Sequence, residues 1–339
     1  MTQRSIDKHN TLAVADIGYV VGVDIGATNL RMALADMTGV IMARHSSSTA
    51  GIRSAETVIA LIRNGVESLL NEISAPAHAL KAVAAGAPGI TDVDAGIVVA
   101  TSYLMGWRDV PLRALLENAL EVPVAVDNDV NLAAIGESWI GAAKNVRDFV
   151  FLAIGTGIGA SIVLNSKPFR GATWAAGEIG YMLVPGTSDR PGNHGEPGAL
   201  ESLIGGEGIK TQWQKLWSTD RSTLPKDLTA TEIFDQAIAG DALAQSVLEQ
   251  TARMLSYTIY NMTLVLNCPL FVLGGGVGIH PALCSWTQSM LERLNMRSQP
   301  HLAGSALGTD AQLMGAIRLA LDTAGSRSTL FANQAAAKE

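Results

Sequence analysis

The sequence predicts a mixed α/β fold built from two similar lobes. Two segments of one kind support this prediction: in each, an apolar strand runs into a glycine-rich turn and a second strand follows, first around residues 24–29 and again around 155–159. Amphipathic helices and further apolar strands come after each segment. A chain of 339 residues with 48% apolar residues is long enough for two domains with large cores.

The first half opens with three strands, predicted over residues 19–24, 30–35 and 40–44 and joined by short turns. Ser54 can cap the next helix, whose apolar face comprises Val58, Leu61, Ile62, Val66, Leu69 and Leu70. A strand over 81–86 ends in Ala87-Pro88-Gly89, and a strand over 122–126 precedes Asp127-Asn128-Asp129.

The second half repeats this plan. Strands are predicted over 148–154 and 160–164. A long amphipathic helix follows, with its apolar face formed by Leu248, Ala252, Leu255, Ile259, Met262 and Leu266. A strand over 270–273 ends in Gly274-Gly275-Gly276, and a last helix is predicted over 311–321.

Charge and composition exclude several classes of function. Lys and Arg number 24 against 31 Asp and Glu, a net charge of −7 that argues against a nucleic-acid partner. Cys268 and Cys284 cannot form a disulfide framework, and they suit a reducing compartment. Because no signal peptide or membrane-length apolar run is present, we expect a soluble, cytoplasmic protein with no membrane partner.

The turn from Asp24 to Asn29 can hold phosphate. Gly26 lets the backbone approach a ligand closely, which leaves amides and the Thr28 hydroxyl to meet phosphate oxygens. Asp24, at the end of its strand, can hold Mg²⁺ through water. The alternative is an ordinary hairpin turn without a ligand.

The second turn, Gly155–Gly159, with Ala160 after it, matches the dinucleotide-binding pattern G-x-G-x-x-A. Glu178 follows at about the sequence spacing expected for the acidic residue that binds the ribose. That pattern requires a helix next, whereas Ser161–Leu164 has the β-branched character of a strand. A phosphate-binding β-hairpin therefore fits better. Gly274–Gly276 allows flat approach to a ring or sugar, or is a plain loop.

Polar residues gather where a predicted strand ends, at Asp127-Asn128-Asp129. One aspartate here can accept a hydroxyl proton, and the Asn128 side chain can bind a sugar hydroxyl. The alternative is that Asp127 or Asp129 caps the next helix. Glu178 lies between two glycines, and Glu201 either binds a ligand or favours a helix dipole. The six histidines show no metal-binding spacing.

In their order along the chain, these pieces resemble the ROK family of sugar kinases and sugar-sensing repressors, which have a two-lobe actin/hexokinase-like (ribonuclease H-like) fold. The resemblance spans about Val20 to Leu321 and rests on the following motifs: Asp24-Ile25-Gly26-Ala27-Thr28 with Arg31, Gly86-Ala87-Pro88-Gly89, Gly106-Trp107, Asp127-Asn128-Asp129-Val130-Asn131, Gly155-Thr156-Gly157-Ile158-Gly159, Gly177-Glu178-Ile179-Gly180, Leu200-Glu201, Gly274-Gly275-Gly276-Val277, Leu307-Gly308 and Gly315-Ala316.

The resemblance implies a role for each motif. Asp129 corresponds to the catalytic base. The sugar-binding residues implied are Gly89, Asn128, Asp129, Glu178, Tyr181 and Glu201. The residues implied to bind the nucleotide are Asp24, Gly26, Ala27, Thr28, Asn29, Arg31, Gly155, Thr156, Gly157, Gly159, Gly274, Gly275 and Gly276. Residues 18–126 with 308–325 would form the first lobe and 127–307 the second, with 1–17 and 326–339 as flexible termini.

The sequence departs from the family pattern in two places. Tyr181 stands where the family has a histidine that binds both zinc and sugar, and residues 182–200 contain no cysteine for the family's zinc knuckle. We therefore predict no zinc, with Pro185, Pro191 and Pro197 stiffening the loop instead. Asp127 stands where the family usually has glutamate. Only residues 1–23 precede Asp24, too few for a winged-helix DNA-binding domain.

The sequence thus predicts an ATP- and Mg²⁺-dependent kinase that acts at the 6-hydroxyl of a hexose or amino-hexose, similar to glucokinases. By family analogy it is a homodimer. An alternative is a non-catalytic, sugar-binding regulatory protein, which the loss of the zinc knuckle supports. A third hypothesis, an NAD-dependent oxidoreductase, rests on the glycine pattern alone and requires a helix after Gly159.

Overall fold

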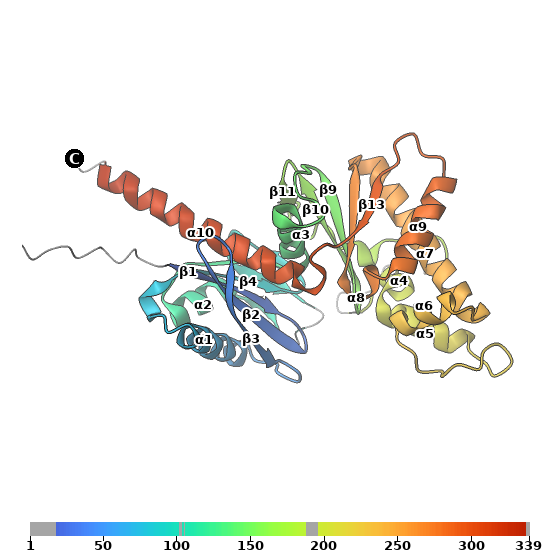
Figure 1. The fold of residues 1–339 in the computed structure, drawn as a ribbon, viewed down its shortest axis with the longest axis horizontal. Coiled ribbons are helices and arrows are strands. Elements are labelled where there is room, and N and C mark those ends of the chain that lie inside the picture. Colours follow the sequence, from blue (N-terminus) through green and yellow to red (C-terminus); the bar gives the residue numbers. More distant parts are fainter. Residues whose placement is uncertain (1–17, 102–103, 105, 188–195, 337–339) are drawn as a thin grey trace, which may run out of the picture.

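The computed structural model describes residues 18–101, 104, 106–187 and 196–336, with side chains described to residue 326. The predicted flexible segment 1–17 lies outside these residues. The described chain forms two α/β lobes side by side, and helix α10 (Ala311–Ala336) runs back along the first (Figure 1). The predicted two-lobe fold is confirmed.

The sheet of the first lobe has the strand order β3-β2-β1-β4-β8. Its strands are β1 (Tyr19–Ile25), β2 (Asn29–Asp36), β3 (Ile41–Ser48), β4 (Leu80–Ala87) and β8 (Val124–Asn128). The first three are antiparallel, as their short turns require, and β4 and β8 add in parallel. Helices α1 (Ala55–Glu72) and α2 (Leu112–Leu120) lie in the connections before β4 and β8.

The sheet of the second lobe repeats this plan in the order β11-β10-β9-β12-β13. Its strands are β9 (Phe149–Ile154), β10 (Ile158–Leu164), β11 (Lys167–Phe169), β12 (Leu270–Gly274) and β13 (His301–Gly304). Three antiparallel strands are again followed by two parallel ones. The same order in both sheets supports two lobes of common design.

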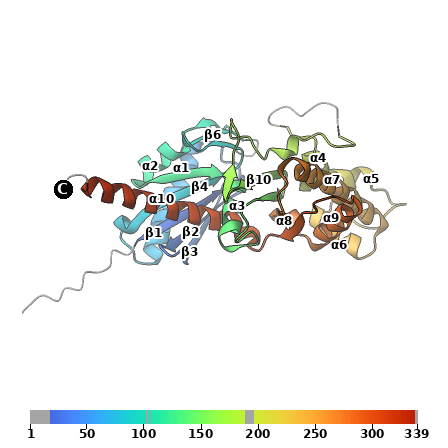
Figure 2. The same cartoon turned by 90° about the horizontal axis from the view of Figure 1, so that it is seen from above.

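The remaining elements cover the sheets or connect them (Figure 2). A small sheet contains β5 (Ile90–Asp92), β6 (Ile97–Ala100) and β7 (Arg108–Val110). The other helices are α3 (Asp129–Ile140), α4 (Glu201–Ile204), α5 (Gly206–Leu216), α6 (Ala230–Ile238), α7 (Ala242–Leu266), α8 (Gly275–Gly278) and α9 (Pro281–Arg293). Single 3-10 turns are η1 (Ala77–Ala79), η2 (Ile179–Tyr181) and η3 (Gly308–Asp310).

Helix α1 begins as predicted, with the Ser54 hydroxyl accepting a hydrogen bond from the Thr57 amide. Its buried face includes five of the six predicted residues, and Leu61 is only partly buried. The face predicted on α7 is likewise buried, except that Leu266 is only partly so. Within the described ranges, no helix combines the length and apolar character that a membrane crossing needs.

Helix α10 joins the last part of the chain to the first lobe. The sequence ended this helix at Leu321, and that boundary is wrong, because the helix continues to Ala336. It packs on β1, β4 and α3, with Leu313, Ile317 and Ala320 buried against the sheet. A Cβ atom on Gly315 would lie 1.7 Å from the Leu132 carbonyl oxygen, so only glycine permits this crossing of α3 and α10.

Glu137, near the end of α3, fastens the two chain segments that pass between the lobes. Its carboxylate is fully buried and accepts hydrogen bonds from the amides of Ala142 (2.6 Å), Ala306 (3.3 Å) and Leu307 (3.0 Å) and from the Ser305 hydroxyl. Residues 305–307 lead from β13 into η3 and α10. One side chain thus ties both passages together.

Replacing Glu137 by Gln should lower the free energy of unfolding by about 3 kcal/mol, because an amide NH₂ would face backbone donors in a buried site. Urea unfolding followed by tryptophan fluorescence measures the change. Glu249→Gln, which removes an exposed ion pair with Arg253, is the control and should cost less than about 0.5 kcal/mol. Equal stabilities of the two variants would contradict the role given to Glu137.

Candidate active site

The first glycine turn joins β1 to β2 and is tied to the chain behind it. The Gly26 amide donates to the Asn29 carbonyl at 2.9 Å, which closes the turn. Thr49 holds the turn from behind, since its hydroxyl donates to the Gly26 carbonyl (2.7 Å) and its amide to the Thr28 carbonyl (3.0 Å). Ala27, Thr28 and Asn29 are exposed, so the tip of the turn is open to a ligand.

Asp24 and Arg31 face each other across the two strands of this turn. The guanidinium donates through Nε (3.0 Å) and Nη2 (2.5 Å) to one oxygen, Oδ2, of Asp24, and through Nη1 to the Thr309 carbonyl (2.6 Å). Burial raises the pKa of Asp24 above its ordinary value, and Arg31 opposes that rise. Arg31 therefore holds a buried carboxylate and also reaches the segment that precedes α10.

The polar triplet lies where β8 becomes α3. Asp127 and Asn128 are among the last residues of the strand, and Asn128 caps the helix by accepting from the amides of Val130 (2.8 Å) and Asn131 (3.1 Å). The alternative that Asp127 or Asp129 is the cap is therefore wrong. The side-chain amide of Asn128 also donates to the Gly89 carbonyl at 2.8 Å, which brings these two predicted sugar-binding residues together.

Asp129 is the first residue of α3 and is only partly buried. Its pKa is raised to about 7, first by loss of hydration and then by the negative charges of Asp24 and Glu178; a hydrogen bond from the Val130 amide works against them. Carboxylates from β1, α3 and the segment before η2 are thus close enough to interact electrostatically. Such a raised pKa is typical of a catalytic acid or base.

The segment after Gly177 places the other predicted sugar-binding residues. Glu178 is exposed and precedes η2, which contains Tyr181. The Glu201 carboxylate accepts from the Ile158 amide at 3.1 Å, so it also holds the second glycine turn. The Tyr181 hydroxyl donates to the Glu196 carbonyl at 3.4 Å, which connects the two ends of the intervening loop.

That loop includes residues 188–195, which lie outside the described residues together with the predicted stiffening residue Pro191. In the part of the chain that is described, no cluster of three or more His, Cys, Asp or Glu side chains could hold a metal ion. The absence of zinc remains a prediction. At the base of the loop, Gly198 packs so closely on Gly180 that a Cβ would lie 2.1 Å from its carbonyl oxygen.

The second glycine turn lines a cavity of about 520 Å³. Its lining residues are Gly155, Thr156, Gly206, Glu207, Lys210, Thr229, Ala230, Thr231, Gly276 and Val277. The predicted phosphate turn and the predicted adenosine segment therefore share one hollow, although Gly274 and Gly275 do not line it. Gly275 has φ +78°, and a Cβ there would lie 2.4 Å from the Ile154 carbonyl oxygen.

Strand β10 begins at Ile158, within the second turn, so no helix follows Gly159. The NAD-dependent oxidoreductase hypothesis required that helix and is excluded. Gly159 instead lies against Val130 of α3, with 3.3 Å between a Cβ built on it and the valine side chain. This contact places the predicted phosphate turn next to the start of the helix that contains Asp129.

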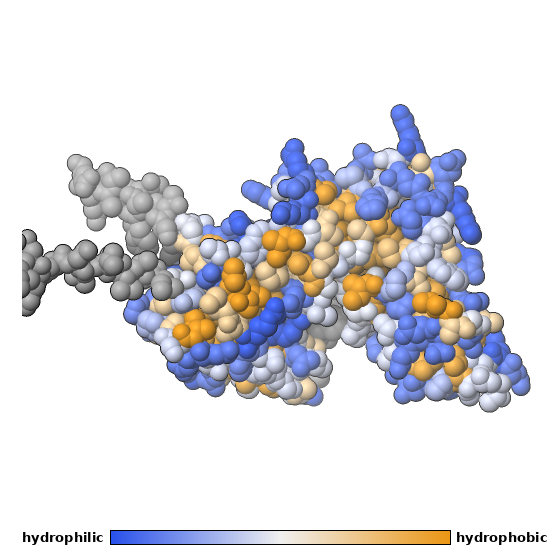
Figure 3. Space-filling model, viewed as in Figure 1, coloured by the Kyte–Doolittle hydropathy of each residue, from blue (hydrophilic) through white to orange (hydrophobic). Residues whose placement is uncertain are grey.

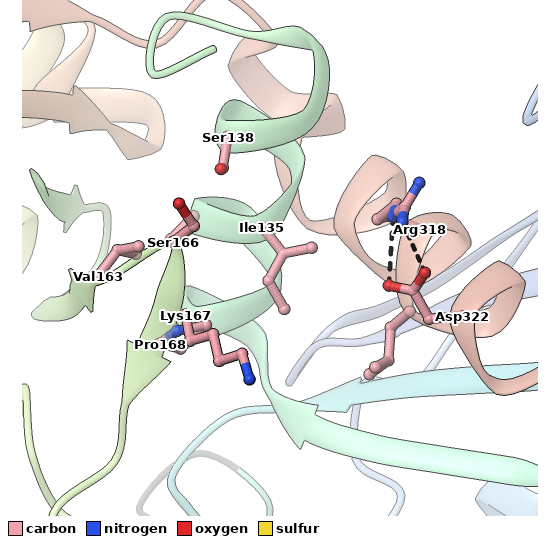
Figure 4. A pocket seen from close by; sticks show the side chains of 10 residues that line it. Ile135, Ser138, Val163, Ser166, Lys167, Pro168, Arg318 and Asp322 are labelled. Carbon is pink, nitrogen blue, oxygen red and sulfur yellow. Dashed lines mark hydrogen bonds and ion pairs between the residues drawn. The ribbon is translucent and has the colours of Figure 1, made fainter. Parts of the chain in front are cut away.

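A second cavity, of about 320 Å³, lies between α3, the β10–β11 turn and α10 (Figure 4). Lys167, Ser138 and the Arg318–Asp322 ion pair line it, and none of the predicted site residues does. The space-filling view shows a separate notch between the two lobes (Figure 3). Because no predicted site residue lines the cavity of about 320 Å³, that cavity is not the predicted site.

Sequence reasoning missed several residues around the site. The cavity of about 520 Å³ is also lined by Glu207, Lys210 and Thr229. Lys210 forms an ion pair with Asp227 at 2.8 Å, which raises the pKa of the lysine. The pattern Thr229-x-x-Glu232 is a capping box and could have marked the start of α6. Arg170, which pairs with Asp127, has no local sequence signal.

Comparison with known proteins gives the family. The ROK family matches residues 20–323. A glucokinase from Halalkalibacterium halodurans is 32% identical over 310 residues, covering 88% of this chain and 93% of that enzyme. A xylose repressor from Caldicellulosiruptor bescii is 26% identical over 84% of this chain and 71% of the repressor.

A solved structure agrees with the sequence relatives. The crystal structure of a ROK family glucokinase from Streptomyces griseus in complex with glucose and AMPPNP has a TM-score of 0.75 to this chain at 25% identity. The match covers 89% of this chain and 99% of that enzyme. Across its length, the chain thus shares both sequence and two-lobe architecture with sugar-phosphorylating enzymes. It belongs to the ROK family and is a sugar kinase.

Proposed function

We propose that this kinase transfers the γ-phosphoryl group of ATP to the 6-hydroxyl of a hexose or amino-hexose, with Asp129 as the general base. The observation that supports it most is the position of Asp129 at the start of α3, where burial and the charges of Asp24 and Glu178 raise its pKa to about 7. A base whose pKa lies near the working pH transfers protons most effectively.

The sugar would bind at the edge where β4 and β8 end. Gly89, Asn128, Glu178, Tyr181 and Glu201 are the proposed contacts, together with Asp129. Asn128 already uses its oxygen on the helix amides and one N–H on Gly89, so a single N–H is left for a sugar hydroxyl. Glu178 is exposed, so its carboxylate would approach a ligand from the second lobe.

The nucleotide would lie across both glycine turns. The amides of Gly26, Gly155 and Ile158 are used within the protein, so those of Ala27 and Thr28 in the first turn and of Thr156 and Gly157 in the second would face the phosphates. The cavity between Thr156 and Val277 has a volume suited to a nucleoside. Gly274 and Gly275 would support this cavity without lining it: they let the segment pack closely on β9, where a side chain at Gly275 would collide. Thr229 and Lys210 add polar groups along its wall.

Asp24 fits the role of holding Mg²⁺ through water. Both hydrogen bonds from Arg31 to Asp24 go to Oδ2, which leaves Oδ1 available to a hydration water. Mg²⁺ in kinase sites binds mainly through substrate phosphates and few carboxylates, so no preformed cluster is needed. When bound, the ion would offset charge on the β- and γ-phosphates.

In the reaction, the sugar oxygen forms a bond to the γ-phosphorus while the bond between that phosphorus and the ADP oxygen breaks. Asp129 takes the hydroxyl proton as this happens. Positioning of the two substrates supplies most of the rate enhancement. The family analogy supports a homodimer, and the free Cys268 and Cys284 suit a reducing compartment such as the cytoplasm. The net charge of −7 supports the absence of a nucleic-acid partner.

A panel of sugars with MgATP tests the proposal directly. Glucose, N-acetylglucosamine, N-acetylmannosamine, allose and fructose are supplied in turn, and ADP release is measured in a coupled assay. At least one hexose should give turnover, with the product phosphorylated at oxygen 6 by ³¹P–¹H correlation NMR. Sugar binding without ADP release would favour the regulatory alternative, and phosphorylation at another hydroxyl would refute the proposed position.

Asp129→Asn should lower kcat by about 10²–10⁴-fold, because the base is lost while the shape is kept. The same variant should have a higher Tm at pH 8, since a charged Asp129 is disfavoured by burial and by Asp24 and Glu178. Asp322→Asn, on the exposed face of α10, is the control for both assays. Near wild-type turnover in Asp129→Asn would remove Asp129 from its role.

The rate should depend on pH with a single acidic limb. Asp129 has a raised pKa of about 7, so it is charged and able to accept a proton only above that pH. We expect kcat/KM for the sugar to fall about tenfold per pH unit below pH 7 and to level off above it. The Tm gain of Asp129→Asn should shrink between pH 8 and pH 5, since the native carboxyl is neutral at pH 5. A flat rate profile down to pH 5 would contradict this assignment.

A further inference from the structure

Arg170 reaches from the second lobe to the segment that begins α3. It follows β11, and its guanidinium pairs with the carboxylate of Asp127 through Nη2 to Oδ2, with a longer contact of 3.4 Å from Nε to Oδ1. Asp127 is 1% exposed, so its charge is almost fully removed from water. Arg170 is the cation that pairs with this buried carboxylate.

Asp127 in turn fixes the residues next to it. Its Oδ1 accepts from the Asn128 amide at 2.8 Å and from the side-chain amide of Asn131 at 3.0 Å. The oxygen of Asn131 accepts from the Ser161 hydroxyl of β10 at 2.8 Å. The Asp127 carboxylate thus fixes the backbone that contains both the helix cap, Asn128, and the proposed base, Asp129.

The backbone of Arg170 is also tied to the other side of the site. Its carbonyl accepts from the Ala176 amide at 3.1 Å, which closes the short loop leading to Gly177 and Glu178. The Gly177 carbonyl then accepts from the Ala160 amide at 2.9 Å. One residue therefore connects the segment of Asp129, which follows β8 of the first sheet, with the segment of Glu178, which is held by β10 of the second sheet.

We propose that Arg170 is a positioning residue for the sugar-binding half of the site, acting through Asp127 on Asn128 and Asp129. This inference rests on the function proposed above. Without the guanidinium, the buried Asp127 carboxylate would draw in water or turn away, and the start of α3 would shift with it. The nucleotide cavity is lined by other residues, so it should be unaffected.

The first test is Arg170→Met. The kcat of the variant should fall about 10- to 100-fold, because misplacing a reacting group by about 1 Å has an effect of this size. Its KM for the sugar should rise. Its KM for ATP should stay within about twofold of wild type. Arg253→Met, which breaks an exposed ion pair on α7, is the matched control and should leave all three constants unchanged. Unchanged kcat in a folded Arg170→Met protein, or an equal rise in both KM values, would overturn the proposal.

A double variant separates positioning from general loss of stability. Asp127→Asn in the Arg170→Met background removes the unpaired buried charge and keeps an oxygen for the Asn128 amide. It should recover part of the lost kcat, and Arg170→Lys should retain more activity than Arg170→Met. A double variant no better than Arg170→Met would count against the proposed route through Asp127.

A readout without turnover keeps this test independent of the proposed function. The side-chain amide signals of Asn128, assigned with Asn128→Asp, report its hydrogen bond to the Gly89 carbonyl. They should move toward free-amide positions in Arg170→Met and remain in place in Arg253→Met. Unmoved signals would refute the role of Arg170. If the signals move but no sugar is phosphorylated by the wild type, only the proposed reaction fails.

Discussion

The burial of Asp129 beside two other carboxylates is the constraint around which the site is built. Loss of hydration opposes the ionisation of Asp129 most, and the negative charges of Asp24 and Glu178 oppose it further, so the fold must hold Asp129 where isolated segments would let it move away. Arg31 offsets the charge of Asp24, and Arg170 that of the neighbouring Asp127. These two ion pairs therefore help to hold the strands of the site together, in addition to the packing of apolar side chains.

Helix α3 connects the proposed catalytic site with the passage between the two lobes. Its first turn contains Asp129 and its cap Asn128, whereas its last turns contain Glu137, which binds the passage into α10. The two ends of one helix thus serve the site and the connection between lobes. Helix α3 also contacts Gly159 and crosses α10 at Gly315, so it packs on the second glycine turn as well as on the helix that covers the first sheet.

Much of this arrangement follows from local sequence. Apolar strands, the glycine turns and the Ser54 cap predicted the first sheet, three strands of the second sheet and helices such as α1, α7 and α10. They did not predict the edge strands β11 and β13 or helices α2, α5, α6, α8 and α9. The roles that the ordered motifs imply for the site residues stay predictions. The cap of α3 was misassigned because Asp127, Asn128 and Asp129 are all good caps, and a tertiary ion pair occupies Asp127. Arg170 and Lys210 gave no signal, since each acquires its meaning from partners distant in sequence. The end of α10 was misjudged because its polar last turns lack the apolar spacing that marked its start.

The return of α10 to the first sheet also bears on how the protein is made. Val20, Ala82 and Ala84 lie on a sheet face that residues 313–324 cover. A ribosome synthesises those strands before the covering helix, so this apolar face stays uncovered until residues 313–324 have emerged. The second lobe, whose core lies within residues 150–302, can close first. During biosynthesis the lobe that contains β1 is thus completed after the second lobe, although its strands are made first.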